Sequence, residues 1–175
     1  SVASTAFVSG ALAALVSRNP LLQPEQVVDL LYQYANESEK PGPDELTGRG
    51  ILNLGRIINR DQRGIRDAAI VGYYFNPEEL KGGTTPFLVS VENRGTAWLK
   101  GVTLKVDFGG ADKILRLGPM DAGEVKSEQF YLDAVQAADP AGTRILSNIT
   151  LDGGPDVKPE NDHRVSRITL PGTQD

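Results

Sequence analysis

The chain has 175 residues, a net charge of −5 and a hydrophobic content of 39%, which is typical of folded domains and excludes wholesale disorder. Its length suits two small units better than one large enzyme domain. Lysine and arginine are scattered along the chain, so we expect no nucleic acid or anionic membrane as partner. Cysteine is absent, which excludes disulfides and thiol nucleophiles.

The first 60 residues have helical periodicity. Residues 6–17 are rich in alanine and leucine, and Pro20 ends this segment. Its apolar residues occupy nearly every side, so we expect a helix buried on all sides by partners that the first 60 residues do not supply. The segment is too short to span a membrane. A second helix begins at Pro24 with one apolar stripe, and residues 51–58 predict a short third helix.

After a charged linker at residues 61–64, the periodicity changes to two. Seven runs rich in β-branched and aromatic residues are separated by glycine, proline, asparagine and aspartate. The runs are AAIVGYYF, PFLVSVEN, WLKGVTLKVDF, KILRLG, VKSEQFYL, RILSNITL and HRVSRITL. Their spacing predicts an antiparallel sandwich of about seven strands over residues 65–171, followed by a tail at 172–175.

Few residues in this chain are candidates for a catalytic or metal-binding site. The single histidine, His163, lies in the last run, where we expect an exposed strand position. Four acidic residues nearby offer oxygen ligands of the type that calcium takes, namely Asp152, Asp156, Glu160 and Asp162. Their spacing is not that of a known calcium loop, so a solvated acidic turn is the alternative. We expect no other cofactor.

Six short blocks follow one another in residues 1–60. They are VSGA at 8–11, AL at 14–15, NP at 19–20, LQP at 22–24, QVVDLL at 26–31 and GRGILN at 48–53. In this order and spacing they resemble the C-terminal segment of a subtilisin-like serine peptidase, an α/β fold in which a nucleophile turn leads into a buried central helix. The resemblance implies an upstream half of the peptidase domain, with the triad aspartate and histidine, and a protein or peptide substrate.

The nucleophile implied by this resemblance is Ser1, which would require one inserted residue before Gly10. The order Ser1-Val2-Ala3 supports this assignment. If the family's spacing between nucleophile and helix glycine is counted back from Gly10 without an insertion (a gapless count), the nucleophile position falls on Val2, which has no nucleophilic atom. Ser1 could also be a residue left by a tag or a cut. Because no histidine lies near Ser1, we expect this chain to be inactive by itself.

The second half resembles the bacterial CARDB module, an immunoglobulin-like sandwich appended to secreted enzymes and surface proteins. The matching features are VENRG at residues 91–95, an expected turn at 117–123 and PEND at 159–162. Together the two resemblances imply part of a secreted or cell-surface endopeptidase with an accessory sandwich. The alternative is a catalytically dead subtilase scaffold, or a surface binding or adhesion protein whose sandwich binds protein or glycan.

Overall fold

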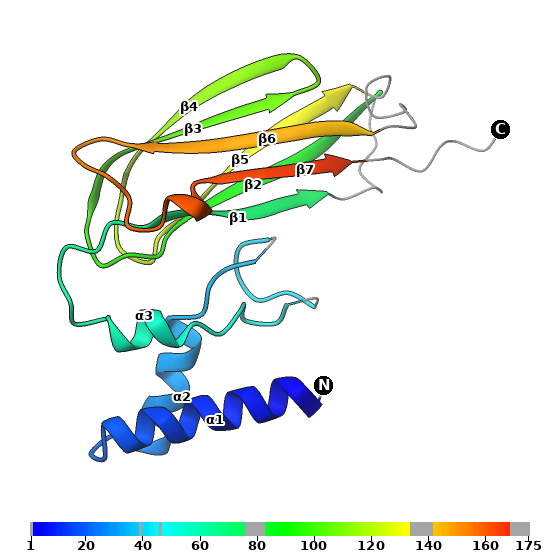
Figure 1. Cartoon of the computed structure of the whole chain (residues 1–175). Helices are drawn as coiled ribbons and strands as arrows, with labels where there is room; N and C mark the ends of the chain where they lie inside the picture. The colour runs from blue at the N-terminus through cyan, green and yellow to red at the C-terminus, as the bar shows by residue number, and fades with distance from the viewer. Residues whose placement is uncertain (1, 39, 46, 76–82, 134–141, 169–175) are drawn as a thin grey trace. The chain divides into compact units, whose positions relative to one another are not determined.

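The computed structural model describes residues 2–38, 40–45, 47–75, 83–133 and 142–168 (Figure 1). The chain divides into two compact units. The first consists of residues 1–38 and 42–62, and the second of residues 39–41 and 63–175. The described part of the first unit contains three α-helices, and that of the second contains seven strands and one short 3₁₀ helix.

Helix α1 (Val2–Arg18) begins earlier than the predicted 6–17, because the residues before residue 6 continue the helix. Ala11 and Leu15 are its buried residues, while every residue from 2 to 10 is exposed. The described residues of this chain do not bury the other sides of α1, so the expected burial by a further partner stays a prediction. Within its own unit, α1 has one buried face.

Helices α2 (Pro24–Gln33) and α3 (Leu54–Ile58) complete the small core of the first unit. Pro24 starts α2 in the first turn, where its missing N–H needs no partner. The third helix begins at Leu54, later than the predicted start at residue 51. Ile51 forms an antiparallel bridge with Asn36, and the Asn53 side chain accepts a hydrogen bond from Arg56 N at 3.2 Å, which caps α3.

The predicted antiparallel seven-stranded sandwich is confirmed, and each strand lies on a predicted run. The strands are β1 (Ala68–Phe75), β2 (Thr84–Asn93), β3 (Leu99–Phe108), β4 (Ala111–Met120), β5 (Val125–Asp133), β6 (Thr143–Leu151) and β7 (His163–Ile168). The last two residues of the seventh run and the tail at 172–175 lie outside the described residues.

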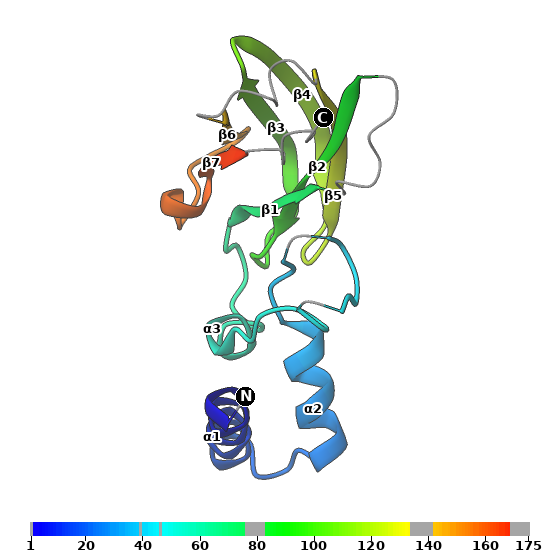
Figure 2. The same cartoon turned by 90° about the vertical axis from the view of Figure 1, so that its right-hand side faces the viewer.

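Two sheets form the sandwich, with strand orders β1-β2-β5 and β4-β3-β6-β7, and all their pairings are antiparallel (Figures 1 and 2). The chain crosses between the sheets after β2, after β4 and after β5. Such crossings are typical of immunoglobulin-like sandwiches. They place segments that are distant in sequence on one face.

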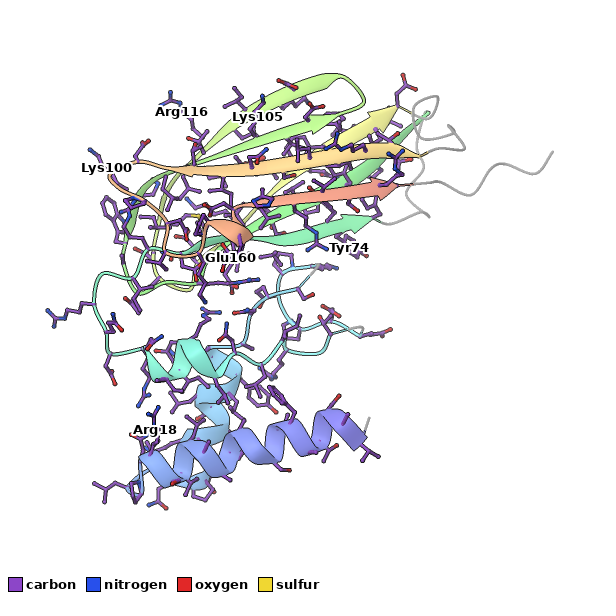
Figure 3. All side chains as sticks on the ribbon, in the orientation of Figure 1. Arg18, Tyr74, Lys100, Lys105, Arg116 and Glu160 are labelled. Atoms are coloured by element: carbon purple, nitrogen blue, oxygen red, sulfur yellow. The ribbon has the colours of Figure 1, made fainter. Side chains whose placement is uncertain are left out.

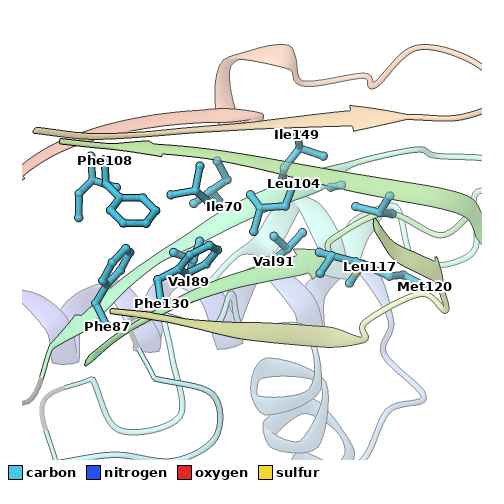
Figure 4. Close-up of a cluster of buried hydrophobic side chains, with 14 of the residues drawn as sticks. Ile70, Phe87, Val89, Val91, Leu104, Phe108, Leu117, Met120, Phe130 and Ile149 are labelled. Atoms are coloured by element: carbon cyan, nitrogen blue, oxygen red, sulfur yellow. The ribbon is translucent and has the colours of Figure 1, made fainter. Parts of the chain in front are cut away.

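The core lies between the two sheets because one face of each strand is apolar. Phe87 and Phe130 from one sheet meet Phe108 from the other, as Figure 4 shows, with ring centroids 5.6 and 5.8 Å from that of Phe108. Val89, Val91 and Leu104 extend the same layer and are fully buried. Offset and edge-to-face ring pairs of this kind add to the stabilisation from burial alone.

The VENRG segment, residues 91–95, forms a turn. Asn93 is fully buried; its Nδ2 donates to Ala97 O at 2.9 Å and Met120 O at 3.2 Å, and its Oδ1 accepts from Gly95 N at 3.1 Å. A Cβ on Gly95 would overlap the carbonyl oxygen of Ile65, so only glycine fits. The turn expected at residues 117–123 begins later, because 117–120 belong to β4.

Candidate functional sites

Of the two positions considered for the nucleophile, only Val2 belongs to the described residues. Ser1 itself is outside the described residues. Val2, the position reached by the gapless count, is the first residue of α1 and its side chain is 90% exposed. His163 is exposed at the start of β7, opposite Asn148 of β6, which confirms the expected strand position.

An apolar groove opens in the first unit between α1, α2 and the segment before α3. Its volume is about 260 Å³. It is lined by Val8, Leu12, Val28, Leu31, Tyr32, Ala35, Arg49, Gly50 and Leu52. The Arg49 guanidinium lies 4.8 Å from the Tyr32 ring centroid, so a cation stacked on an aromatic ring forms one wall. The groove can accept an apolar side chain.

The GRGILN block and α3 both contact the segment that follows α2. A Cβ on Gly50 would overlap the Asn36 carbonyl oxygen, and the φ of Gly50 is +103°, so glycine is required there. Arg56 is 9% exposed and its Nη1 donates to Ala35 O at 2.9 Å and to Asn36 Oδ1 at 3.2 Å. Sequence reasoning missed Arg56, because a single arginine in a short helix gives no signal of burial.

An acidic cluster joins the loop before β7 to the start of β1. Asp156 Oδ2 accepts from Ala68 N at 2.7 Å, and Asp156 Oδ1 accepts from Lys158 N at 2.6 Å. Asp67 is 2% exposed; its Oδ1 accepts from Asn161 Nδ2 at 2.9 Å, and its Oδ2 lies 3.6 Å from Lys158 Nζ. These contacts fasten the loop to the first strand.

The pKa of Asp162 is raised to about 7 in this cluster. Burial is the largest cause, followed by the charge of Asp156, a hydrogen bond to Asp156, and the charges of Asp67 and Glu160. Neighbouring carboxylates repel one another when both are charged, so at neutral pH a proton is shared within the cluster. The protonation of this cluster therefore changes near neutral pH.

The structure groups three of the four predicted calcium ligands with Asp67, which sequence reasoning missed. Asp152 lies apart, where its N–H donates to Gly101 O at 3.0 Å. The oxygens of Asp156 and Asp67 already accept hydrogen bonds from N–H groups. In the described part of the chain, no group of three or more His, Asp or Glu residues is arranged to hold a metal ion. Calcium binding stays a prediction.

No protein-family model matches the chain, and no curated protein matches it in sequence. Solved structures similar to it include the CARDB domain of a Pyrococcus furiosus protein in complex with di-metal ions, at 15% identity and a TM-score of 0.44, covering 60% of this chain and 88% of that one. A domain of a proposed cell surface protein from Methanosarcina acetivorans has 12% identity and a TM-score of 0.47, covering 64% and 98%.

A β-glucosidase from Listeria innocua in complex with glucose is also similar, at 14% identity and a TM-score of 0.34, covering 61% of this chain and 16% of that one. Similarity at these scores carries no conclusion about family or function. The antiparallel sandwich rests on the strand pairing itself. None of the described helices combines the length and hydropathy that a membrane crossing requires.

Proposed function

We propose that the chain is the C-terminal part of a secreted or cell-surface subtilisin-like serine endopeptidase, extended by a CARDB-like sandwich. The observation that carries the proposal is α1, whose 17 residues contain no charge before Arg18 and expose Phe7, Val8 and Val16. Burying one such large side chain contributes about 1.5–3 kcal/mol. This helix therefore suits a larger core, to which another segment contributes.

In the proposed reaction, Ser1 Oγ attacks the carbonyl carbon of the peptide bond. A histidine from the upstream half of the peptidase domain accepts the serine proton and then donates a proton to the leaving amine. Backbone N–H groups at the start of α1 help to stabilise the oxyanion. Water hydrolyses the acyl-enzyme and regenerates the serine. Because removing a triad member costs on the order of 10⁴ in rate, the isolated chain should be inactive.

The test uses the longer natural protein that contains this sequence. Treatment with a serine-directed fluorophosphonate, followed by peptide mapping, should label Ser1, and Ser1→Ala should abolish both labelling and peptide hydrolysis. The 175-residue chain by itself should stay unlabelled. Labelling of the isolated chain, or hydrolysis by the longer protein with the label on another serine, would contradict the assignment of Ser1.

The second candidate is a catalytically dead scaffold or surface binding protein whose sandwich binds protein or glycan. It is favoured by the gapless count, which lands on Val2 and so leaves no nucleophile. The residues directly before Ser1 separate the two candidates. A Gly-Thr ending favours the peptidase, whereas a glycine directly before Ser1, or a Gly-Thr-Ser elsewhere, favours the scaffold.

A further inference from the structure

The outer face of the four-stranded sheet brings together cations that are scattered in the sequence. Successive side chains on a strand alternate between the two faces of its sheet. On β3, Val102, Leu104 and Val106 are buried, so Lys105 lies on the outer face. Figure 3 shows Lys105 and Arg116 on the outer side of β3 and β4.

The register of the strands places four cations on this face. Lys105 pairs with Ile114 of β4, and Arg116 of β4 pairs with Thr103 of β3. Arg144 of β6 lies directly opposite Arg167 of β7, and both are exposed. Arginine forms bidentate hydrogen bonds with carboxylates, so two arginines at neighbouring positions suit an acidic group.

The net charge of this face differs in sign from that of the chain. The outward positions that the strand register pairs carry the four cations and two carboxylates, Asp107 and Asp112, a net charge of +2 against −5 for the chain. Lys105 Nζ and Asp112 Oδ2 form an ion pair of 3.1 Å in which both side chains are about half exposed. Such exposed pairs are weak and can exchange partners. The face is complementary to an acidic partner.

Aliphatic side chains lie among these cations. Ile114 is 67% exposed and Val165 is 53% exposed, and Leu146 lies opposite Val165 on the neighbouring strand. The outward side chains on these four described strands include no Phe, Tyr or Trp, and His163, opposite Asn148 of β6, is the one aromatic ring among them. Single-stranded nucleic acids stack successive bases on several aromatic side chains, whereas this face offers a single imidazole. Apolar side chains with arginine beside them are typical of protein interfaces.

We propose that this face, which we call the cationic face and define by Lys105, Ile114, Arg116, Arg144, Val165 and Arg167, docks an acidic protein segment that has apolar side chains among its carboxylates. The arginines bind carboxylates in bidentate geometry. The aliphatic residues bury the apolar side chains of the partner. This docking does not depend on the peptidase assignment, because it uses the sandwich alone.

The test measures binding of a fluorescein-labelled peptide of alternating glutamate and leucine blocks to the full 175-residue chain by fluorescence anisotropy. Replacing two cations of the face, Arg116→Glu with Arg144→Glu, should weaken the Kd about tenfold or more at low salt. The matched control, Arg18→Glu with Arg63→Glu, changes the net charge equally but leaves the face intact. It should change the Kd less than about twofold.

Two further measurements keep the proposal falsifiable if the glutamate variant unfolds. Amide chemical shifts of the wild-type chain on adding the peptide should change in β3, β4, β6 and β7. Changes confined to β1, β2 and β5 would overturn the proposal, and so would equal weakening by both double variants. Binding of polyglutamate or heparin as tight as that of the glutamate-leucine peptide would also overturn it, because the face would then recognise charge alone.

Discussion

The two units of this chain differ in how much apolar surface each buries by itself. Among the described residues, the sandwich core contains 16 buried residues, whereas the helical unit contains five. Two sheets packed face to face bury both inner faces. In the helical unit, by contrast, the other helices cover only one face of α1, and its opposite face is exposed. From this difference we expect the sandwich to fold by itself, and we expect the helical unit to need further contacts.

The largest expected effect comes from separating the two units. A polypeptide of residues 63–175 should unfold in one cooperative thermal transition, because its core is complete. A polypeptide of residues 1–62 should show no cooperative transition, since a core of this size supplies little stability. Calorimetry on both would check this. Cooperative unfolding of residues 1–62 alone would remove the contrast between the units.

A single substitution in the sandwich core should have the next largest effect. Phe87 is 1% exposed and stacks on Phe130 at a centroid distance of 5.2 Å. Phe87→Ala should lower the free energy of unfolding by about 3–5 kcal/mol, as is usual for a buried phenylalanine. Tyr131→Ala is the control, since Tyr131 is 56% exposed, and should change it by about 0.5 kcal/mol. Urea denaturation measures both, and equal losses would contradict the proposed core.

The VENRG turn should contribute less than the core. Asn93→Ala removes two hydrogen bonds to carbonyl groups and one from the Gly95 amide. We expect a loss of about 1–3 kcal/mol, because buried polar groups would be left without partners. Asn148→Ala on the outer face serves as the control and should cost less than about 1 kcal/mol. If both variants unfold at the same urea concentration, the turn does not depend on Asn93.

The acidic cluster should give the smallest effect, visible as a pH dependence. The pKa of Asp162 is about 7 in the folded chain and about 3.9 in an unfolded one. Between these values the folded state binds more protons, so stability falls as pH rises. The contribution is complete below about pH 4 and is lost through about pH 7. After solvent screening, we expect a change within about 1 kcal/mol.

Asp162→Asn tests this dependence, because asparagine does not ionise. From pH 5 to pH 8, the free energy of unfolding of the variant should fall less than that of the wild type. Asp107→Asn, on the outer face of the other end of the sheet, should leave the slope unchanged. Identical slopes for the wild type and Asp162→Asn would show that the cluster does not share a proton.

Most of the secondary structure could be predicted because its signals are local. The alternation in β3 follows from one buried face, and Pro24 marks the start of α2. The starts of α1 and α3 were wrong for different reasons. α1 extends through Val2–Thr5 although three of these four residues are weak helix formers. α3 is shortened by the pairing of Ile51 with Asn36, a contact that local periodicity does not reveal.

The acidic cluster could be predicted only in part. Sequence proximity grouped Asp152 with Asp156, Glu160 and Asp162, but folding groups these last three with Asp67. The hydrogen bond between Asp67 and Asn161 joins residues 94 positions apart. Such a contact depends on which strand the loop packs against, so no spacing within the loop could reveal it.

Local patterns specify most of the strands and helices, because periodicity and turn residues act over a few positions. Strand neighbours and their register depend on contacts made in the folded chain. That register places Arg144 opposite Arg167 and sets Lys105 and Arg116 on the same face. Scattered cations thus become one surface, since the contacts that fix strand order join segments distant in the chain.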